Sequence, residues 1–415
     1  SIKVTADGKE ITVPIKTKIL AIEIPKELNF IIELNNYGFG KDKNYFYEIH
    51  KLAHIFRTGY NTLSYSHSGN TSVSFIPAVT GLGKDAKIAD WSVWDEWMEP
   101  LLNGKVFEDL PRGPVPIPQF YMPFHENYPM PVTEYMEGKM HNKRKELKDD
   151  KLFMPYMCEN DVLVENGFSQ TWKDGVFTIG QAYRKHFEEK GWFKTEFQLF
   201  CNNKVFKGAE KATSLWTLDE PTYGRDFRAL GYLGLEFLKP FDGSKLNMVS
   251  RADISRPTAQ GNRVDHGVNL TVAGGGFYGE HFFISKRMKE LGERYWVYGG
   301  GGGPEKDPTQ LLATYIKMWR LGCDGGLAYW TSFTGFSWDD YSKPDATNAV
   351  VLKGEHGYKL KPTASYSLAI QRRSQQDIEL MILLSKKPGW NKQMVSAFVD
   401  SAVNLASATS SRNAE

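Results

Sequence analysis

Residues 30–65 read FIIELNNYGFGKDKNYFYEIHKLAHIFRTGYNTLSY, and this stretch decides the fold class. It opens with an apolar run at residues 30–34, which is typical of a buried strand. Apolar residues then recur at helical spacing over residues 45–56, and Gly59 ends that helix. A second apolar run follows at residues 62–65. Strand, helix and strand in close succession predict a right-handed parallel crossover.

The same alternation returns near the C-terminus. Residues 295–298 form an apolar run, and Asp307-Pro308 then supplies an N-cap with proline at the first helical position. Gly322 ends that helix, and residues 326–330 follow as another buried strand.

Other apolar runs between these two units bring the candidate strands to nine. They lie at residues 117–122, 195–200, 215–218, 248–251 and 268–272. An alternating chain of this size fits an α/β fold of the (β/α)8 TIM barrel type, with one candidate left over. We expect residues 117–122 to be the extra one, within a long insertion over residues 68–192 early in the barrel. A doubly wound sheet is the alternative.

The N-terminal segment has a pattern of its own. Residues 4–15 alternate polar and apolar side chains around Asp7-Gly8, a two-residue turn signal, and so predict a β-hairpin. Because an isolated hairpin is marginally stable, we expect residues 1–25 to be an accessory β-segment. It either ends a β-sandwich-type domain or packs on the main domain, and the barrel spans residues 26–415.

Composition limits the partners of the chain. Its 415 residues are 41% hydrophobic, which is typical of a globular protein, and the net charge of +2 argues against a nucleic-acid partner. No apolar run approaches the roughly 20 residues that span a bilayer, so membrane insertion is not expected. Aromatic residues make up 13% of the chain, which suits stacking against sugar rings. The three cysteines are widely spaced and indicate neither disulfides nor a zinc site.

Polar residues follow the candidate strands, at the end where barrel enzymes place their functional groups. Amides, aromatics and carboxylates without a cofactor-binding motif favour a polyhydroxylated substrate and no cofactor. The candidate substrate-binding residues are Asn35, Tyr65, His67, Glu126, Asn203, Arg251, Tyr298 and Trp330. Structural alternatives apply to several of them: His67 and Arg251 could satisfy buried carbonyls, Tyr298 and Trp330 could pack in the core, and Glu126 could be an ordinary loop acid.

The sharpest motif is Leu218-Asp219-Glu220-Pro221, with two adjacent carboxylates after an apolar run. Neighbouring like charges oppose each other's ionisation, so one member is expected to stay protonated near neutral pH. A protonated carboxyl group is what a general acid needs to protonate a glycosidic oxygen. The alternative is a solvated pair that caps the next helix.

Two other patterns are weak. His50 and His54 stand one helical turn apart, but Lys51 replaces the glutamate of the zinc motif, so no metal site is predicted. The glycine runs at residues 274–276 and 299–303 lack the lysine and hydroxyl residue of a phosphate loop, and we expect them to be rim loops.

Seven short motifs occur in order across residues 28–385. They are Asn35-Asn36-Tyr37-Gly38, Tyr65-Ser66-His67-Ser68-Gly69, Asp90-Trp91-Ser92, Leu218-Asp219-Glu220-Pro221, Trp296-Val297-Tyr298-Gly299, Asp324-Gly325-Gly326-Leu327-Ala328-Tyr329-Trp330 and the stretch from Arg372 to Glu379. In this order they resemble glycoside hydrolase family 123 and its relatives, whose TIM barrels carry an Asp-Glu pair.

The resemblance implies a β-N-acetylgalactosaminidase-like activity with substrate-assisted retention, in which the acetamido oxygen of the sugar attacks the anomeric carbon. Glu220 would be the general acid and then the base, while Asp219 would orient the acetamide N–H and stabilise the oxazolinium-like intermediate. The resemblance also implies a secreted or periplasmic location. One alternative is a glycosidase for a non-acetylated polysaccharide that pairs Glu220 with a distant carboxylate, Glu126 or Asp253. Another is a carbohydrate-binding pseudoenzyme.

Overall fold

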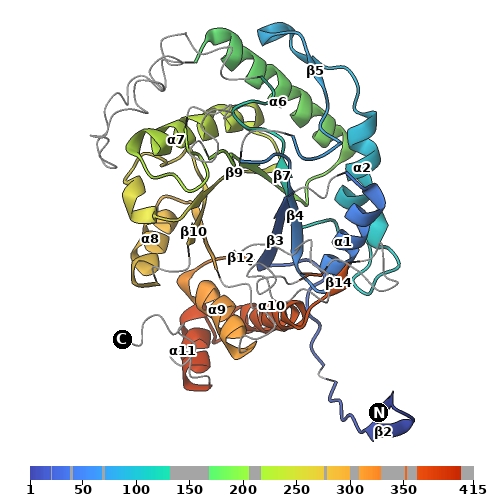
Figure 1. Cartoon of the computed structure of the whole chain (residues 1–415). Coiled ribbons are helices and arrows are strands. Elements are labelled where there is room, and N and C mark those ends of the chain that lie inside the picture. Colours follow the sequence, from blue (N-terminus) through green and yellow to red (C-terminus); the bar gives the residue numbers. More distant parts are fainter. Residues whose placement is uncertain are drawn as a thin grey trace.

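The protein is a barrel of parallel strands surrounded by helices (Figure 1). The computed structural model describes residues 1–19, 21–37, 41–67, 71–130, 168–204, 216–274, 278–299, 308–328, 351–352 and 362–402. Within these ranges, eight strands form the central sheet in the order β4-β3-β12-β11-β10-β9-β8-β7. They are β3 (Ile31–Tyr37), β4 (Gly59–Leu63), β7 (Gln119–Met122), β8 (Glu196–Phe200), β9 (Asn247–Ile254), β10 (Leu270–Gly274), β11 (Arg294–Tyr298) and β12 (Gly325–Ala328).

The sheet closes on itself in two different ways. The last strand, β12, pairs in parallel with the first, β3. Strands β7 and β4 are instead joined through side chains: the Gln119 amide donates to the carbonyl oxygen of Gly59 at 3.0 Å, and the Tyr121 N–H donates to Asn61 Oδ1 at 2.7 Å. The closed ring confirms the TIM barrel and shows that the doubly wound alternative is wrong.

Helices cover the outside of the barrel. They are α1 (Lys43–Ile55), α2 (Ser92–Leu102), α6 (Gln170–Lys190), α7 (Gly224–Leu238), α8 (Tyr278–Glu290), α9 (Pro308–Leu321), α10 (Tyr366–Ser385) and α11 (Lys392–Ala402). Short 3-10 helices lie at Gly83–Asp85, Lys105–Phe107, Lys239–Phe241 and Pro257–Gln260. Between β9 and β10 the described chain has the last of these in place of an α-helix. No helix among the described residues combines the length and the apolar character that a membrane span needs.

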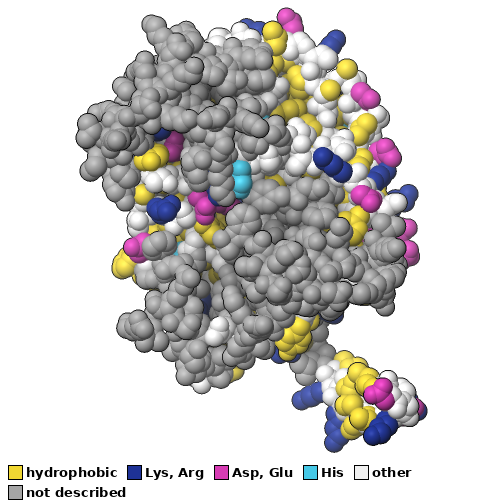
Figure 2. All heavy atoms as spheres, in the orientation of Figure 1, with side chains coloured by type: hydrophobic (Ala, Val, Ile, Leu, Met, Phe, Trp, Pro, Cys, Tyr) yellow, Lys and Arg dark blue, Asp and Glu magenta, His cyan; other side chains and the backbone are white. Residues whose placement is uncertain are grey.

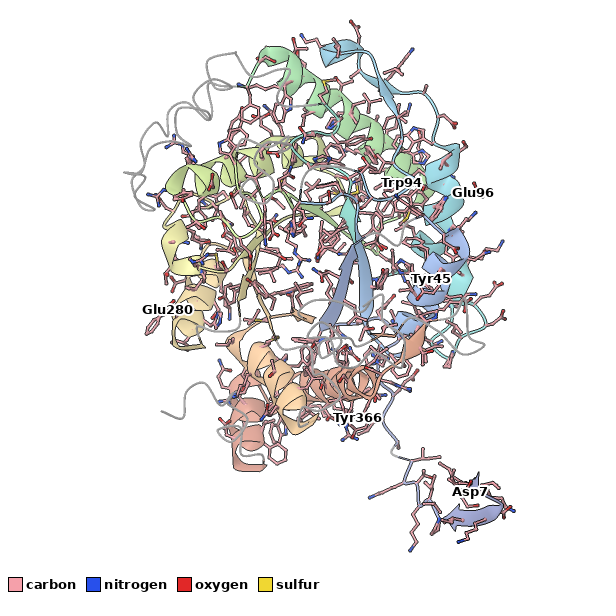
Figure 3. All side chains as sticks on the ribbon, in the orientation of Figure 1. Asp7, Tyr45, Trp94, Glu96, Glu280 and Tyr366 are labelled. Atoms are coloured by element: carbon pink, nitrogen blue, oxygen red, sulfur yellow. The ribbon has the colours of Figure 1, made fainter. Side chains whose placement is uncertain are left out.

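Three small antiparallel sheets accompany the barrel. They pair β1 (Ile2–Ala6) with β2 (Lys9–Val13), β5 (Val79–Thr80) with β6 (Lys87–Ile88), and β13 (Val351–Leu352) with β14 (Thr363–Ala364). The first is the expected N-terminal hairpin, and its turn places Asp7 and Gly8 at φ of 49° and 72°. Such left-handed values match the tight turn that this pair of residues predicts. The hairpin extends away from the barrel, with Asp7 at its tip (Figures 1 and 3).

Two strand predictions are wrong. Residues 117–122 were expected outside the barrel, but β7 pairs with β8 along its whole length. Of the candidate at residues 215–218, the described residues 216–218 form no strand and lie in the loop between β8 and α7. These residues are nevertheless buried, which explains the apolar pattern. An apolar run in the sequence predicts that its side chains are buried, but it does not predict that its backbone pairs with another strand.

The expected insertion over residues 68–192 is also smaller than predicted. Its described parts contain α2, β7 and α6, which are ordinary elements of the barrel. Residues 131–167 lie outside the described part of the chain. At the first crossover, the expected end of the helix is wrong as well: α1 ends at Ile55, and Gly59 begins β4.

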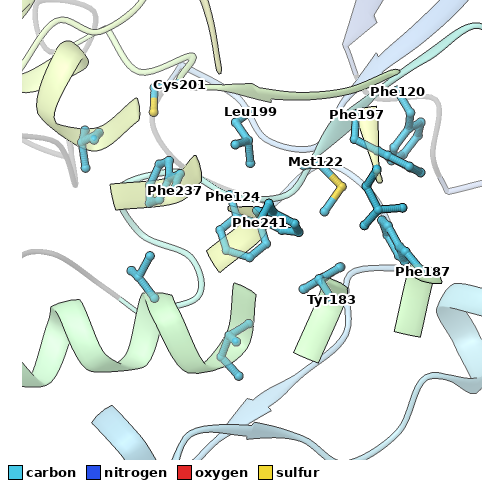
Figure 4. Packing of buried hydrophobic residues seen from close by; sticks show 14 of the residues in the cluster. Phe120, Met122, Phe124, Tyr183, Phe187, Phe197, Leu199, Cys201, Phe237 and Phe241 are labelled. Carbon is cyan, nitrogen blue, oxygen red and sulfur yellow. The ribbon is translucent and has the colours of Figure 1, made fainter. Parts of the chain in front are cut away.

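The apolar core lies between the strands and the helices. In Figure 4, the outward side chains of β7 and β8 (Phe120, Met122, Phe197 and Leu199) pack with Tyr183 and Phe187 of α6. On α2, Trp94 is buried in the same cluster while Glu96 lies on the exposed side (Figure 3). The inward positions of these two strands, by contrast, carry Gln119, Tyr121, Glu196, Gln198 and Phe200, all buried. The interior of this barrel is therefore largely polar on this side.

A glycine brings α7 close to the segment that precedes β10. A Cβ atom on Gly234 would lie 1.8 Å from the carbonyl oxygen of Gly267. We therefore expect Gly234→Ala to lower the free energy of unfolding by about 1–3 kcal/mol, because the backbone has to shift. Urea denaturation followed by circular dichroism measures this change.

The matched control is Gly175→Ala, at a helical glycine of α6. Its Cβ would meet the flexible end of the Met130 side chain, with Sδ at 2.2 Å, rather than backbone. We expect a change of less than about 1 kcal/mol there, because the helix propensity of alanine offsets the rearrangement. Equal destabilisation by both substitutions would contradict the packing argument.

Candidate active site

Asp219 and Glu220 lie in the loop between β8 and α7, at the carboxyl end of the barrel. The Leu218 and Asp219 N–H groups both donate to the carbonyl oxygen of Asn203, at 2.8 and 3.1 Å. The Glu220 N–H donates to the carbonyl oxygen of Asp253 at 2.9 Å. These bonds hold the pair over the ends of β8 and β9.

The apolar run before the pair had predicted a strand, but the pair lies in a loop. This difference changes the geometry of the two side chains. Adjacent side chains on a strand point to opposite faces. Glu220 instead adopts φ of 53°, a left-handed conformation that is uncommon for a residue with a side chain. This turn allows the two neighbouring carboxylates to approach one common partner.

That partner is Lys204, which follows β8. Its Nζ lies 3.0 Å from Asp219 Oδ2 and 2.7 Å from Glu220 Oε2. The Lys204 side chain is only 4% exposed, whereas that of Glu220 is 33% exposed. The sequence pattern pointed to the neighbouring Asn203 and not to Lys204, because an isolated lysine after a strand usually belongs to the solvated surface.

Two further predicted residues reach the pair from other strand ends. The Tyr298 hydroxyl, at the end of β11, donates to Glu220 Oε1 at 2.5 Å. His67, which follows β4, has Nδ1 3.5 Å from Asp219 Oδ2 and 2.9 Å from the carbonyl oxygen of Asn202. In the space-filling view, acidic side chains and a histidine lie together near the middle of the face (Figure 2). The structure thus brings Asp219, Glu220, His67 and Tyr298 together.

The surroundings push the two carboxyl groups in opposite directions. Burial raises the pKa of Asp219 to about 7, with Lys204 opposing the shift and the nearby Asp253 and Glu220 adding to it. Burial would also raise the pKa of Glu220, but hydrogen bonds from Lys204 and Tyr298 outweigh it and hold that pKa below its ordinary value. Below about pH 7 the proton of the pair is therefore favoured on Asp219 and the negative charge on Glu220.

Arg251 lies below the pair, inside the barrel, and not at the rim where substrate contact was expected. It is completely buried, with Nη1 2.5 Å from Glu33 Oε1 and Nε 2.8 Å from Asp253 Oδ1. The guanidinium also lies 4.9 Å from the centre of the Tyr121 ring and 5.2 Å from that of Phe200. Arg251 therefore contacts the site from within the barrel, and its contact with a substrate stays a prediction.

The remaining candidates are mostly buried. Tyr65 is 2% exposed, and its hydroxyl lies 2.9 Å from the carbonyl oxygen of Phe124 and 2.8 Å from that of Phe200. Asn203 and Glu126 are completely buried, and Asn35 is 9% exposed. Trp330 lies outside the described residues. Substrate binding by these residues stays a prediction.

The described residues contain no group of three or more histidine, cysteine or acidic side chains that could hold a metal ion. His50 and His54 are core residues of α1. Burial lowers the pKa of each to about 3, and the His54 ring stacks on Phe107 with the ring centres 4.4 Å apart. Both histidines therefore serve packing.

Comparison with known proteins shows similarity in fold. No protein-family model matches the chain, and no curated protein does. Among solved structures, a family 123 glycoside hydrolase from Clostridium perfringens, studied for glycolipid glycan hydrolysis, aligns with a TM-score of 0.56 and 14% identity. The alignment covers 96% of this chain and 68% of that one. The fold expected from the motif resemblance is thus found.

A second similar structure is more distant. A β-galactosidase from the psychrophilic Marinomonas ef1 aligns over 89% of this chain and 62% of that one, with 9% identity and a TM-score of 0.45. This similarity is too low to support an argument about the site.

The position of Arg251 predicts a large effect on stability. Arg251→Met leaves the carboxyl groups of Glu33 and Asp253 buried without their cation, which is expected to lower the free energy of unfolding by about 3–5 kcal/mol. The control is Arg256→Met, because Arg256 is exposed and its guanidinium bonds only to the Ser255 hydroxyl among the contacts described. We expect that variant to change stability by less than about 0.5 kcal/mol. Similar denaturation midpoints for both variants would contradict the supporting role of Arg251.

Proposed function

We propose that the protein is a glycoside hydrolase that cleaves β-linked, N-acetylated hexosaminides with retention of configuration. The observation that carries this proposal is the Asp219-Glu220 pair, held at the carboxyl end of a TIM barrel around the Lys204 ammonium. Its surroundings raise the pKa of Asp219 and lower that of Glu220. This is the position where barrel enzymes place their chemistry. The motif resemblance and the similar fold of a family 123 enzyme support the choice of reaction.

The separation of the two carboxyl groups favours retention. Asp219 Oδ2 and Glu220 Oε2 both contact Lys204 Nζ, so they cannot be farther apart than the sum of the two distances, about 5.7 Å. Inverting enzymes need roughly 6.5–9.5 Å between their carboxyl groups to accommodate a water molecule. The pair is too close for that arrangement.

The exposure of the two residues suggests their roles. Glu220 is the more exposed member, and we assign it the protonation of the glycosidic oxygen and the later activation of water. Asp219 is nearly buried, and we assign it the orientation of the acetamide N–H and the stabilisation of the positively charged intermediate. Glu220 then needs a proton and Asp219 needs a negative charge. Transfer of the single proton of the pair from Asp219 to Glu220 supplies both at once.

The pKa directions also favour a second candidate. An ionised Glu220 is suited to attack an anomeric carbon, and a protonated Asp219 to assist the leaving group, on a glycan without an acetamido group. Asp253, one of the distant carboxylates considered from the sequence, is instead bound to Arg251. The second candidate therefore uses the same adjacent pair.

Paired aryl β-glycosides with and without a 2-acetamido group test the proposal. We expect turnover confined to the acetamido sugars, because the acetamido oxygen is the nucleophile. Glu220→Gln and Asp219→Asn are each expected to lower kcat by about 10²–10⁴-fold, whereas Glu290→Gln, at an exposed acid of α8, is expected to leave kcat unchanged. Turnover of plain glycosides would favour the second candidate. Calorimetric binding of a glycan without turnover of any substrate would indicate a carbohydrate-binding protein.

The pKa of Asp219 predicts the alkaline limb of the pH profile. Below about pH 7 the pair holds one proton, and above it this proton is lost, so kcat/KM is expected to fall as the pH rises through about 7. The acidic limb should lie below 4.5, the ordinary pKa of glutamate, because the pKa of Glu220 is lowered. In Asp219→Asn the residual activity should lose the limb near pH 7. An unchanged limb in that variant would assign it to another group.

A further inference from the structure

Lys204 lies at the centre of the site and is almost completely buried. Its N–H donates to the carbonyl oxygen of His67 at 3.0 Å, and its ammonium contacts Asp219 and Glu220. Lysine is rarely this buried unless its charge is paired, because removing an ammonium group from water is unfavourable. The position is therefore built around the two carboxylates.

Four carboxyl groups face two buried cations in this part of the barrel. Arg251 contacts Glu33 and Asp253, and Lys204 contacts Asp219 and Glu220. The carboxyl groups thus outnumber the cations, and each cation contacts two carboxyl groups. Among the described residues, Lys204 is the one cationic side chain that forms an ion pair with both Asp219 and Glu220.

The contacts of Lys204 are not symmetrical. Its ammonium is closer to Glu220, which also accepts the Tyr298 hydroxyl, than to Asp219, whose side chain is more buried. Both donors favour negative charge on Glu220. The deeper carboxyl group then keeps the proton.

We propose that Lys204 is a positioning residue, which holds Asp219 and Glu220 around one ammonium and decides which of them carries their shared proton. Its importance for turnover rests on the proposed function, whereas its effect on the two carboxyl groups does not. The ammonium keeps its charge across the working pH range: burial lowers its pKa, but Asp219 and Glu220 outweigh this and raise it above the ordinary value.

Other charged and titratable groups interact with the pair or with its neighbour Asp253. His67 after β4, Asp253 on β9, Arg256 beyond β9 and Tyr298 on β11 interact with the pair, and Glu33 on β3 and Arg251 on β9 interact with Asp253. Substitution of Lys204 alone leaves these groups in place. A changed titration of the pair can therefore be assigned to the ammonium.

Infrared titration of the protonated carboxyl band in the full-length protein tests the proposal without any glycoside. Loss of a band in Asp219→Asn or Glu220→Gln assigns it to one residue. We expect Lys204→Met to raise the titration midpoint of Glu220 by about one to two pH units, because a charge-assisted hydrogen bond is lost. Lys204→Arg, which keeps the charge, should shift it by less than half as much. Arg256→Met is the control for a nearby cation that contacts neither carboxylate.

The kinetic readout is the alkaline limb of kcat/KM. Without the ammonium both carboxyl groups hold protons more tightly, so the limb should move above pH 7 in Lys204→Met and return toward pH 7 in Lys204→Arg. A merely structural role would lower activity without moving the limb.

The outcomes separate this proposal from the proposed function. Unchanged carboxyl titration in Lys204→Met overturns the positioning role, whatever the activity. A shifted titration in a protein that hydrolyses no glycoside supports the positioning role and overturns the proposed function. If Lys204→Met does not fold, Lys204→Met combined with Asp219→Asn leaves Glu220 as the single carboxylate of the pair. The Glu220 midpoint should then be higher than in Asp219→Asn alone, and an equal midpoint would overturn the proposal.

Discussion

The ion pairs of the buried Arg251 are the constraint on which the rest of the site depends. The guanidinium joins β9 to β3 through Glu33, and it holds Asp253 on its own strand. The backbone carbonyl of Asp253 in turn accepts the N–H of Glu220. The position of the loop that carries Asp219 and Glu220 is therefore linked to bonds made inside the barrel, and stability and site geometry meet at one residue.

A polar barrel interior has an electrostatic consequence. Charges removed from water interact strongly, so a neighbouring carboxylate perturbs another more than it would at the surface. The unfavourable desolvation is offset elsewhere, by the apolar layer between strands and helices that includes Trp94, Trp172 and Phe197. The outer core thus supplies the stability that allows the barrel interior and the loop above it to hold four carboxyl groups around two cations.

Periodicity was sufficient to predict the barrel, because residues 30–65 and 295–330 alternate strand and helix patterns clearly. Periodicity could not identify which apolar runs pair as strands of the sheet. Residues 216–218 are buried in a loop, while half of the side chains of β7 point into the polar interior of the barrel. The unexpected burial of Arg251 has a related cause. The predicted strand ended there, but β9 continues to Ile254, and three more residues place the side chain deep in the barrel.

Lys204 could not be predicted because its role depends on loop conformation. The two adjacent carboxylates reach one ammonium only because they lie in a loop and Glu220 has a left-handed backbone conformation. Strained conformations of this kind persist where surrounding bonds over-determine them, and here the carbonyl groups of Asn203 and Asp253 do so. With the two carboxyl groups tied to a single nitrogen, their separation is limited by the length of two hydrogen bonds. Burial of the loop keeps the proton on the deeper carboxyl group, and the separation stays below the one that inverting enzymes use. The ionisation and the stereochemistry that we propose therefore both follow from the conformation of this loop.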